Sequence, residues 1–443
     1  MIRRALLAVV LAVCSAPLVS AQNVVQSTSP TVAELLQNLY GPSGLIVDSE
    51  AVLPDGSTHS AHFNGAFQSE FKQINIALVR QLGALPIPSP ASGFTYAFDT
   101  STGTFVRSTQ SFGPILADRA ETIGRGRFAF GYSLQQFSFE TFDGLGLTHI
   151  PAVFTHDDFQ LGGGRADVIT TQNAIAASVS QSAFSLTYGP TDRFDVSLGV
   201  PLIRTTLSAS SNATIHRIGT ASNPAIHFFR DPGAPGTYGS TRRFEARGTA
   251  MGLGDLIVRG KGTAFKTSRA GVAVGVEVRV PTGNEENLLG SGSPGVKLFE
   301  AVSVTYARIA PHLNVAYQWN GNTVLAGDVA LATKADLPDE LSYVVGADVA
   351  VDKRLSMAFE LIGRHSSDAP RLSPRTFTVA DAQSLSFPDI TFTPGSLDVV
   401  SGAVGMKANV GGTVLITFNM QFKLNDAGVR TKVTPLIGLE YGF

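Results

Sequence analysis

Ionisable residues share one face of segments in which apolar and polar side chains alternate. Asp255, Arg259 and Lys261 lie in one such segment, and Glu277 and Arg279 lie in the next. A period of two is typical of a β-strand, whose successive side chains point to opposite faces. These charges could bind a polar solute along a pathway, or they could form ion pairs with one another.

The turn TSRAG (267–271) would connect these two strands. If it leaves three residues unpaired, Lys261 lies opposite Glu277, and Arg259 lies opposite Arg279. Two interpretations stay open, a ligand site and a structural ion network that fills a narrow lumen, and the network is the simpler because small barrels have polar interiors anyway. The same inward face is expected to carry further charges from other strands: Asp348, Glu360, Arg364, Lys407, Lys423 and Lys432.

Glu440 lies in the last strand, TKVTPLIGLEYGF (431–443). The first strand begins with IGRGRFAF (123–130), where Arg125 and Arg127 are expected to point inward. Closing the sheet would bring these two strands together, so we predict that Glu440 pairs with one of the two arginines. Losing one partner of such a poorly hydrated pair should cost more than the pair itself contributes.

Alternating segments recur after residue 122, and most reach the roughly 9–11 residues that a tilted strand needs to cross a bilayer. Long connections such as 211–250 and 367–395 alternate with tight turns such as PTDR (190–193) and VDKR (351–354). This rhythm is typical of a barrel with short periplasmic turns and long outer loops. We place twelve strands, at 123–141, 168–189, 193–210, 251–267, 270–282, 296–309, 311–320, 341–352, 354–366, 396–410, 413–424 and 430–443.

The predicted fold is therefore an all-β membrane protein, a 12-stranded antiparallel transmembrane barrel with a partly helical N-terminal segment. An even strand number puts both termini in the periplasm. The outward face should contact the lipid bilayer of the outer membrane. Tyr441 and Phe443 suit its interface, and we expect the barrel-assembly machinery to contact them.

The first residues predict export. Arg3 and Arg4 precede an apolar run, and Val19-Ser20-Ala21 provides small residues for cleavage, so residues 1–21 read as a signal peptide. Cys14, the one cysteine, lies inside it; lipidation there is an alternative that the bulky Val13 disfavours. Charged residues make up 15% of the chain, against about 25% in soluble domains, and the formal net charge of −2 gives no sign of a nucleic-acid partner.

Residues 22–121 differ from the barrel at 122–443. TVAELLQNLY (31–40) and SEFKQINIALVRQL (69–82) space their apolar residues as helices do. GFTYAF (93–98) and TFVRST (104–109) could form a hairpin. This segment could plug the lumen, with a part such as 85–118 inserted, or it could dock in the periplasm.

Candidate metal and catalytic residues are sparse. His59 and His62 could contribute zinc ligands, but neither a cysteine of the mature chain nor a further nearby histidine completes the set. HDD (156–158) and NEEN (284–287) could bind calcium, but ordinary acidic loops explain them better, because calcium needs six or more oxygens and neither run forms a recognisable calcium loop. LGGGRAD (161–167) lacks the lysine of a phosphate loop. We therefore expect no metal, no cofactor and no enzymatic activity, with a barrel-embedded lipid hydrolase as a minor alternative.

Two stretches carry a family resemblance. GTAMGLGDLIVRGKGTAF (248–265) and VEVRVPTGNEENLLGSGSPGVKLFEAVSV (276–304) resemble the outer-membrane β-barrel "transporter" family named after meta-pathway phenol degradation. The resemblance covers about 122–443, and it implies a barrel that passes aromatic or other small apolar compounds. In layout only, the N-terminal segment resembles the helical hatch of long-chain fatty-acid transporters. The most specific residues of the resemblance to the phenol-degradation family are Gly252, Gly254, Asp255, Pro281, Thr282, Gly283 and 287–292.

The predicted function is passage of small hydrophobic or aromatic compounds across the outer membrane. The alternative is a structural or surface-interaction barrel with a sealed lumen, whose loops at 211–250 and 367–395 bind partners.

Overall fold

The structure is a computed structural model. The predicted signal peptide with Cys14, the His59/His62 pair, Asp157 and Asp158, and residues 161–166 lie outside the described part. Among the described residues, no helix is long and apolar enough to cross a membrane. The described residues are 31–41, 45, 47–49, 63–64, 66–88, 96–99, 104–107, 110–156, 167–218, 227–230, 238–329, 331–379, 385–411 and 413–443.

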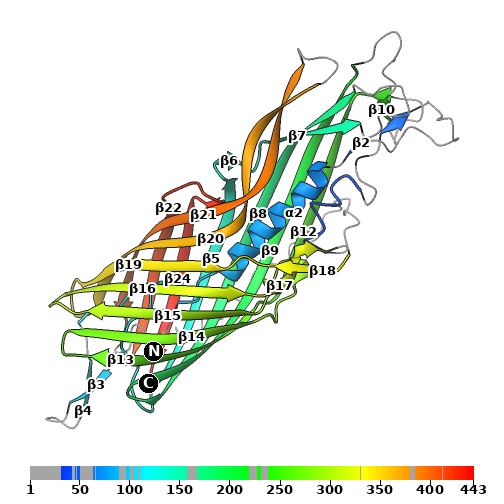
Figure 1. Ribbon diagram of the computed structural model, residues 1–443. Helices are drawn as coiled ribbons and strands as arrows, with labels where there is room; N and C mark the ends of the chain where they lie inside the picture. Colours follow the sequence, from blue (N-terminus) through cyan, green and yellow to red (C-terminus); the bar gives the residue numbers. More distant parts are fainter. Residues whose placement is uncertain are drawn as a thin grey trace, which may run out of the picture.

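A closed antiparallel barrel forms the body of the molecule (Figure 1), which confirms the predicted fold class with twelve strand positions. Two of these positions are interrupted strands, β12 with β13 and β23 with β24. In order around the barrel the strands are β5 (Phe128–Phe142), β8 (Val168–Thr191), β9 (Phe194–His216), β12 (Thr241–Leu253) with β13 (Leu256–Lys266), β14 (Ala270–Val280), β15 (Gly295–Val304), β16 (Ile309–Asn320), β19 (Glu340–Ala350), β20 (Leu355–Thr378), β21 (Ser386–Asn409), β22 (Val414–Lys423) and β23 (Val429–Thr431) with β24 (Val433–Gly442).

The seam joins the last strand to the first. β24 pairs with β5 from Leu436 opposite Gln135 to Gly442 opposite Ala129. The terminal residue takes part, because the Phe443 N–H donates to the Phe128 carbonyl at 3.0 Å and the Phe128 N–H donates back at 2.9 Å. Closure removes unpaired strand edges, which hydrocarbon does not tolerate.

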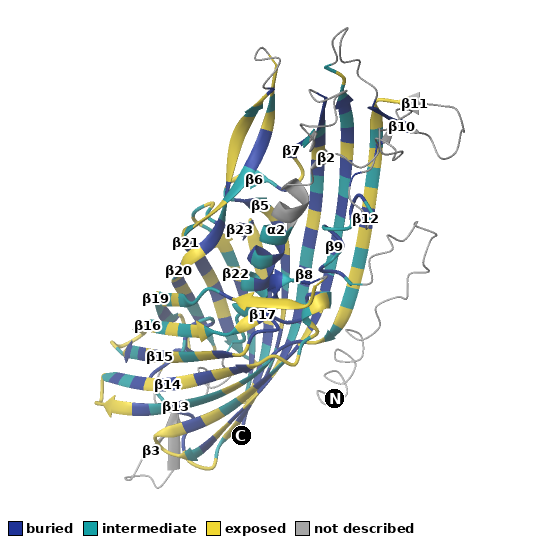
Figure 2. Cartoon of the chain, turned by 45° about the vertical axis from the view of Figure 1, so that its right-hand side comes forward, coloured by how far each residue is buried: buried dark blue, intermediate teal, exposed yellow. Residues whose placement is uncertain are grey.

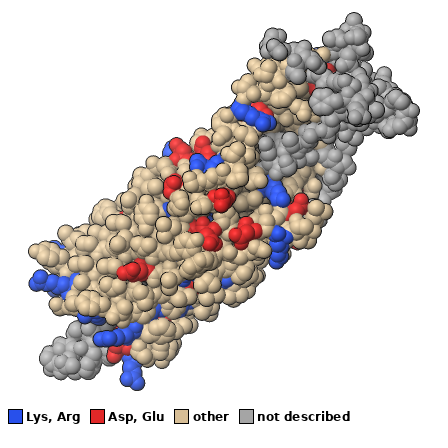
Figure 3. All heavy atoms as spheres, in the orientation of Figure 1, with Lys and Arg blue, Asp and Glu red and all other residues tan. Residues whose placement is uncertain are grey.

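The outer wall is apolar, and Figure 2 shows buried and exposed residues alternating along the strands. Val274, Val276 and Val278 of β14 are exposed, as are Ile437 and Phe443 at the C-terminus. The face drawn in Figure 3 carries few charges along the barrel wall. A continuous apolar surface of this kind is stable against lipid rather than water.

Aromatic side chains mark the two rims of this apolar wall. Phe128 stacks on Tyr188, with ring centroids 4.5 Å apart, and lies 5.5 Å from the ring of Phe443. Tyr317 and Trp319 pack edge to face near the opposite end of β16. We call the rim with Phe443 the turn end, because the short connections 192–193, 267–269, 305–308, 351–354 and 410–413 lie there, and we call the other rim the loop end.

The wall is uneven at the loop end (Figure 1). β8, β9 and β12 rise on one side and β20 with β21 on the other, while β14, β15, β16 and β19 between them are shorter. Helix α2 (Ala66–Gly83) lies within this cut and packs against β17 (Asn322–Asp328). β17 pairs with β18 (Thr333–Asp336).

The N-terminal segment is less helical than its spacing predicts. Residues 31–40 form successive turns instead of a helix, with N–H to carbonyl bonds of 3.3 Å from Leu35 to Val32 and from Leu39 to Leu36. The apolar pattern is nevertheless used, because Val32, Leu35, Leu36 and Leu39 are all buried. The predicted hairpin is present as β3 (Tyr96–Asp99) paired with β4 (Thr104–Arg107).

The remaining elements are short. They are β1 (Asp48–Ser49), β2 (Phe63–Asn64), β6 (Leu145–Gly146), β7 (Ile150–His156), β10 (His227–Arg230), β11 (Tyr238–Gly239) and the 3-10 turn η2 (Glu285–Asn287). Of these, β7 pairs with β8 and lengthens the wall at the loop end.

Candidate functional site

A strap made of residues 110–123 crosses the lumen towards the turn end. Side chains of the inner wall bind its backbone directly. The Glu360 carboxylate accepts from the N–H groups of Ile115, Leu116 and Ala117 at 3.0–3.2 Å. Lys261 Nζ donates to the carbonyls of Arg119 and Glu121, both at 2.9 Å. The strap thus uses inward charges of the wall in place of a β-sheet partner.

Buried charges fix the middle of the strap. Arg119 Nη2 lies 2.7 Å from Asp348 Oδ2, and the two side chains are only 2% and 1% exposed. His312 Nδ1 lies 3.4 Å from Asp348, and its Nε2 lies 3.7 Å from Glu360. Ser111 contacts both Arg119 and Asp348. Three strands, β16, β19 and β20, and the strap therefore meet in one network of charges.

A second crossing lies on the loop-end side and consists of the end of α2 and residues 83–87. The Pro86 carbonyl accepts from Gln135 Nε2 at 2.7 Å and from Gln181 Nε2 at 3.0 Å. Arg279 Nη1 donates to the Gly83 carbonyl at 2.8 Å. Hydrogen bonds from three different strands hold this crossing against the wall.

A chamber of about 220 Å³ lies between the two crossings. Its apolar lining comes from both crossings and from the wall, and its charged lining comes from the wall alone. The apolar residues include Leu85, Ile87, Leu116, Phe137, Phe139, Val344, Ile362, Val399 and Val429, and the charged ones are Arg259, Glu277, Lys297, Glu340, Arg364, Lys423 and Arg430.

Most of these charges are paired. Glu277 lies between Arg259, which it contacts directly, and Lys297 at 2.6 Å. Arg259 also reaches Asp118 of the strap at 2.8 Å. Lys423 lies beside Asp426.

The predicted register of this hairpin is wrong by two residues. Arg259 lies opposite Glu277, and Ile257, not Arg259, lies opposite Arg279. The turn leaves four residues unpaired instead of three, since Lys266 pairs with Gly271, and a bulge between Thr263 and Phe265 adds one more. Lys261 therefore lies opposite Gly275, and its ammonium is free to reach the strap.

Glu440 points inward as predicted, but its predicted partner is wrong. It is 6% exposed, lies 2.9 Å from Lys407 Nζ and accepts from Thr417 Oγ1 at 3.2 Å. Its neighbour across the seam is Gly131. Arg125 is exposed and Arg127 partly exposed, because the chain turns at 124–127 and β5 begins only at Phe128.

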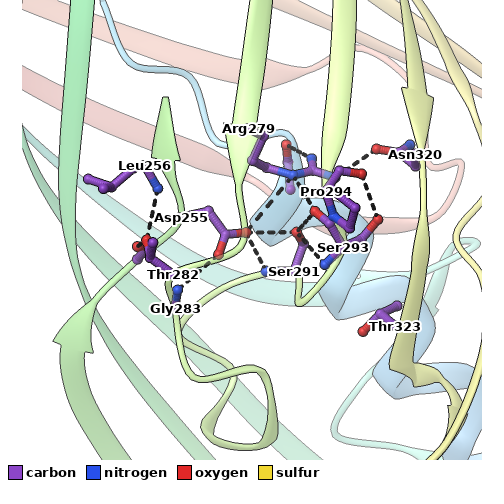
Figure 4. Close-up of polar contacts among 12 residues, drawn as sticks. Asp255, Leu256, Arg279, Thr282, Gly283, Ser291, Ser293, Pro294, Asn320 and Thr323 are labelled. Carbon is purple, nitrogen blue, oxygen red and sulfur yellow. Dashed lines mark hydrogen bonds and ion pairs between the residues drawn. The ribbon is translucent and has the colours of Figure 1, made fainter. Parts of the chain in front are cut away.

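Asp255 and Arg279 bind an inward-folded loop, residues 281–294 (Figure 4). Asp255 accepts from the N–H of Gly283 at 3.1 Å and from the N–H and hydroxyl of Ser291, both at 2.7 Å. Arg279 donates to the Ser293 carbonyl at 3.1 Å and to Asn320 Oδ1 at 2.7 Å. The residues that carry the family resemblance thus hold this loop in place.

Gly290 gives a direct test of that role. A Cβ at Gly290 would lie 2.2 Å from Asp255 Oδ1, while a Cβ at Gly146 would meet nothing within 4 Å. We expect Gly290→Ala to cost about 1–3 kcal/mol of stability and Gly146→Ala to change little. The measurement is the temperature at which the folded barrel loses its heat-modifiable migration in detergent gels. Equal transition temperatures for the two variants would contradict the packing described.

The other predicted residues are divided between the lumen and the surface. Asp348, Glu360, Arg364 and Lys407 lie inside the barrel, where Arg364 Nη2 donates to Gln81 Oε1 of α2 at 2.8 Å. Lys432 is exposed at the break between β23 and β24. The register shift between Arg430 and Thr431 interrupts the regular pairing there, so that Arg430 is buried while Lys432, two residues on, is exposed.

Sequence reasoning missed Arg430, Lys297 and the strap residues Asp118 and Arg119. Lys297 and Arg430 could have been found from strand alternation. Lys297 lies an even number of residues from the inward side chains of β15, and Arg430 lies two residues before Lys432, which was predicted to point inward. Nothing periodic marks the strap.

Of the candidate calcium ligands in NEEN, Glu285 accepts a hydrogen bond from Thr323 Oγ1 at 2.6 Å. Within the described ranges no three His, Cys, Asp or Glu side chains are grouped to hold a metal ion.

Fold and site together define a closed membrane barrel whose lumen holds a strap, a helix and a small chamber between them. No family model matches the chain, and no curated protein matches it. The resemblance to the phenol-degradation family therefore stays a prediction.

Several solved outer-membrane proteins are similar in outline. An outer-membrane channel from Pseudomonas putida F1 is 13% identical, with a TM-score of 0.44 over 74% of this chain and 99% of that one. A FadL homologue from Pseudomonas aeruginosa is 10% identical, with a TM-score of 0.32 over 80% and 96%. The toluene transporter TbuX from Ralstonia pickettii is 11% identical, with a TM-score of 0.32 over 72% and 90%. Similarity at this level carries no argument about solutes, so the function is argued from the site itself.

Proposed function

We propose that this protein is an outer-membrane channel for small hydrophobic or aromatic compounds, with both termini in the periplasm and the N-terminal segment as its gate. The observation that carries this proposal is the chamber, because two crossings of the lumen leave a partly apolar space between them. Passage makes and breaks no bond, and the crossings would admit one solute at a time.

The outer wall supports a membrane location. A closed sheet with exposed valines, leucines and aromatics outside and buried charges inside is the arrangement that a bilayer requires. The twelve strand positions place the two ends of the sheet at one rim, and the short turns at that rim are the kind found on the periplasmic side.

The size of the chamber supports a small aromatic solute. A cavity of about 150 Å³ lined by Leu, Ile and Phe is enough to hold benzene, and the chamber is about 220 Å³. Phe137, Phe139 and Leu85 supply apolar contacts on one side. A single ring therefore fits without displacing either crossing.

Uptake by cells tests the proposal. Cells that lack their general porins and express this protein should take up radiolabelled toluene faster than cells with the empty vector. Leu85→Trp should slow uptake because the larger side chain fills the chamber, and heat-modifiable migration would show that the variant still folds. If cells with the folded wild-type protein took up toluene only at the rate of the empty vector, the proposal would be contradicted and a sealed structural barrel would be favoured.

Assembly supplies a second part of the proposal. Tyr441 and Phe443 are 41% and 56% exposed, and their rings lie 5.4 Å apart at the turn end. We propose that the barrel-assembly machinery recognises this pair. Because Phe443 also pairs with Phe128, recognition there would act on the strand that closes the barrel.

A further inference from the structure

Three arginines lie near one another beside the chamber: Arg364 and Arg430 line it, and Arg80 lies next to Arg364 outside its lining. Arg80 comes from α2, Arg364 from β20 and Arg430 from β23. We call them the arginine cluster. Among the described residues, Glu340 is the one carboxylate within ion-pair distance of the cluster. It lies 3.8 Å from Arg364 Nη1. Arg80 and Arg364 are half-buried and Arg430 is buried, and the three guanidinium groups have one carboxylate within ion-pair distance, although buried cations are ordinarily paired.

Among the three arginines of the cluster, Arg430 has the positive charge that is least balanced by a nearby carboxylate. It is 6% exposed, and its Nη2 donates to the Val400 carbonyl and the Ser401 hydroxyl, both at 2.8 Å. Its buried Nε has no hydrogen-bond partner, and no described carboxylate lies within ion-pair distance. Arg364 is near enough for the two positive charges to repel each other, and the opposite effect of the more distant Asp426 is smaller. An unpaired buried charge of this kind is costly unless something binds it.

Arg80 reinforces the same excess of positive charge. Its guanidinium contacts the hydroxyl of Ser366 on β20. Burial lowers the pKa of Arg80 to about 10, and the neighbouring charge of Arg364 acts in the same direction while Glu340 opposes it. Arg80 is therefore still a cation at neutral pH, and the cluster carries a net charge of +2.

Other charges of the chamber do not share this property. Arg259 and Lys297 are matched by Glu277 and Asp118. Lys423 is matched by Asp426. The positive excess is therefore local, and it adjoins the apolar lining made by Val399 and Val429.

We propose that the arginine cluster binds the carboxylate of a small aromatic acid whose ring rests on the apolar lining of the chamber. A guanidinium presents parallel N–H donors that match the two oxygens of a carboxylate. Arg430 and Arg364 both line the chamber and are close enough for their charges to interact, so they supply two neighbouring guanidinium groups to it. This inference rests on the proposed function and narrows its solute to an anion.

Binding to the purified full-length barrel in detergent tests this inference, with benzoate as the probe and benzyl alcohol as its neutral counterpart. Arg430→Gln and Arg364→Gln should each weaken benzoate binding about tenfold or more, because a hydrogen bond to a charged group is lost. Binding of benzyl alcohol should be unchanged. Lys432→Gln is the matched control, since it removes an exposed charge two residues from Arg430, and Arg430→Lys should retain part of the affinity.

Three outcomes would overturn the inference. Benzoate affinity that is equal in wild type, Arg364→Gln and Arg430→Gln would remove the cluster from the site, while toluene uptake could still uphold the channel. Equal losses for benzoate and benzyl alcohol would show a packing effect instead of charge recognition. A wild-type protein that neither binds benzoate nor takes up toluene would end both proposals. If Arg430→Gln fails to fold, Arg364→Gln decides alone.

Discussion

Deletion of residues 31–122 should raise the single-channel conductance of the barrel severalfold. The deletion removes both crossings of the lumen, including α2, and a helix with its side chains is about 10–12 Å across. The space it leaves would be water-filled, because the inner wall is lined by charges such as Arg259, Lys261 and Glu360. Planar-bilayer recordings on the refolded variant measure the change.

A shorter deletion separates the two crossings. Removing 31–87 leaves the strap tied to Glu360 and Lys261, and an obstacle that remains in the lumen still limits the current. We therefore expect this variant to conduct less than the longer deletion does. Equal, high conductance of the two deletions would show that the strap does not obstruct the lumen, and unchanged conductance of the longer one would show that the crossings leave it open.

Replacing Arg119 by methionine should have the largest effect of any single substitution considered. The change removes the arginine at 2.7 Å and leaves the buried Asp348 carboxylate with Ser111 and the more distant His312, and removing one partner of a buried pair costs about 3–5 kcal/mol. The strap should then detach locally. Hydrogen exchange at the N–H groups of Ile115, Leu116 and Ala117 should speed up, because Glu360 protects them only while the strap is seated.

Two further variants control this experiment. Arg354→Met removes an exposed arginine from the turn 351–354 and should leave exchange unchanged. Arg119→Met combined with Asp348→Leu removes both charges and should recover most of the loss. Wild-type exchange rates in Arg119→Met would mean that the strap does not depend on this ion pair.

The twelve strand positions were readable because strands that face lipid on one side and a polar lumen on the other must alternate. The strand ends were not, since β9, β12, β20 and β21 extend into the ranges 211–250 and 367–395 that were predicted as long connections. β14 shows this in its valines, and the seam shows it in Ile437, Tyr441 and Phe443. Side-chain partners were not readable, because each bulge or extra turn residue moves the register. An extra turn residue and a bulge beside Phe265 together reassigned Arg259, and beside a second register shift at Thr431 Arg430 is buried while Lys432 is exposed.

The strap could not be predicted from the sequence for a different reason. Glu360 and Lys261 bind its peptide N–H and carbonyl groups, which every residue possesses except for the missing N–H of proline. Such contacts place few demands on the side chains of 110–123, so no periodic pattern records them. The strap was instead indicated only indirectly, by inward charges of the wall for which the sequence offered no partner.

The connection between strap and seam bears on how the molecule is made. The strap ends at Ile123, and the chain enters at Phe128 the strand β5, which pairs with β24 to close the sheet. The growing sheet can therefore curl around a strap that is already present, with β24 docking onto β5 as the final step. An occupant enclosed in this order needs no entry route through a finished pore, and its hold on Glu360 and Lys261 would help to template the curvature of the wall.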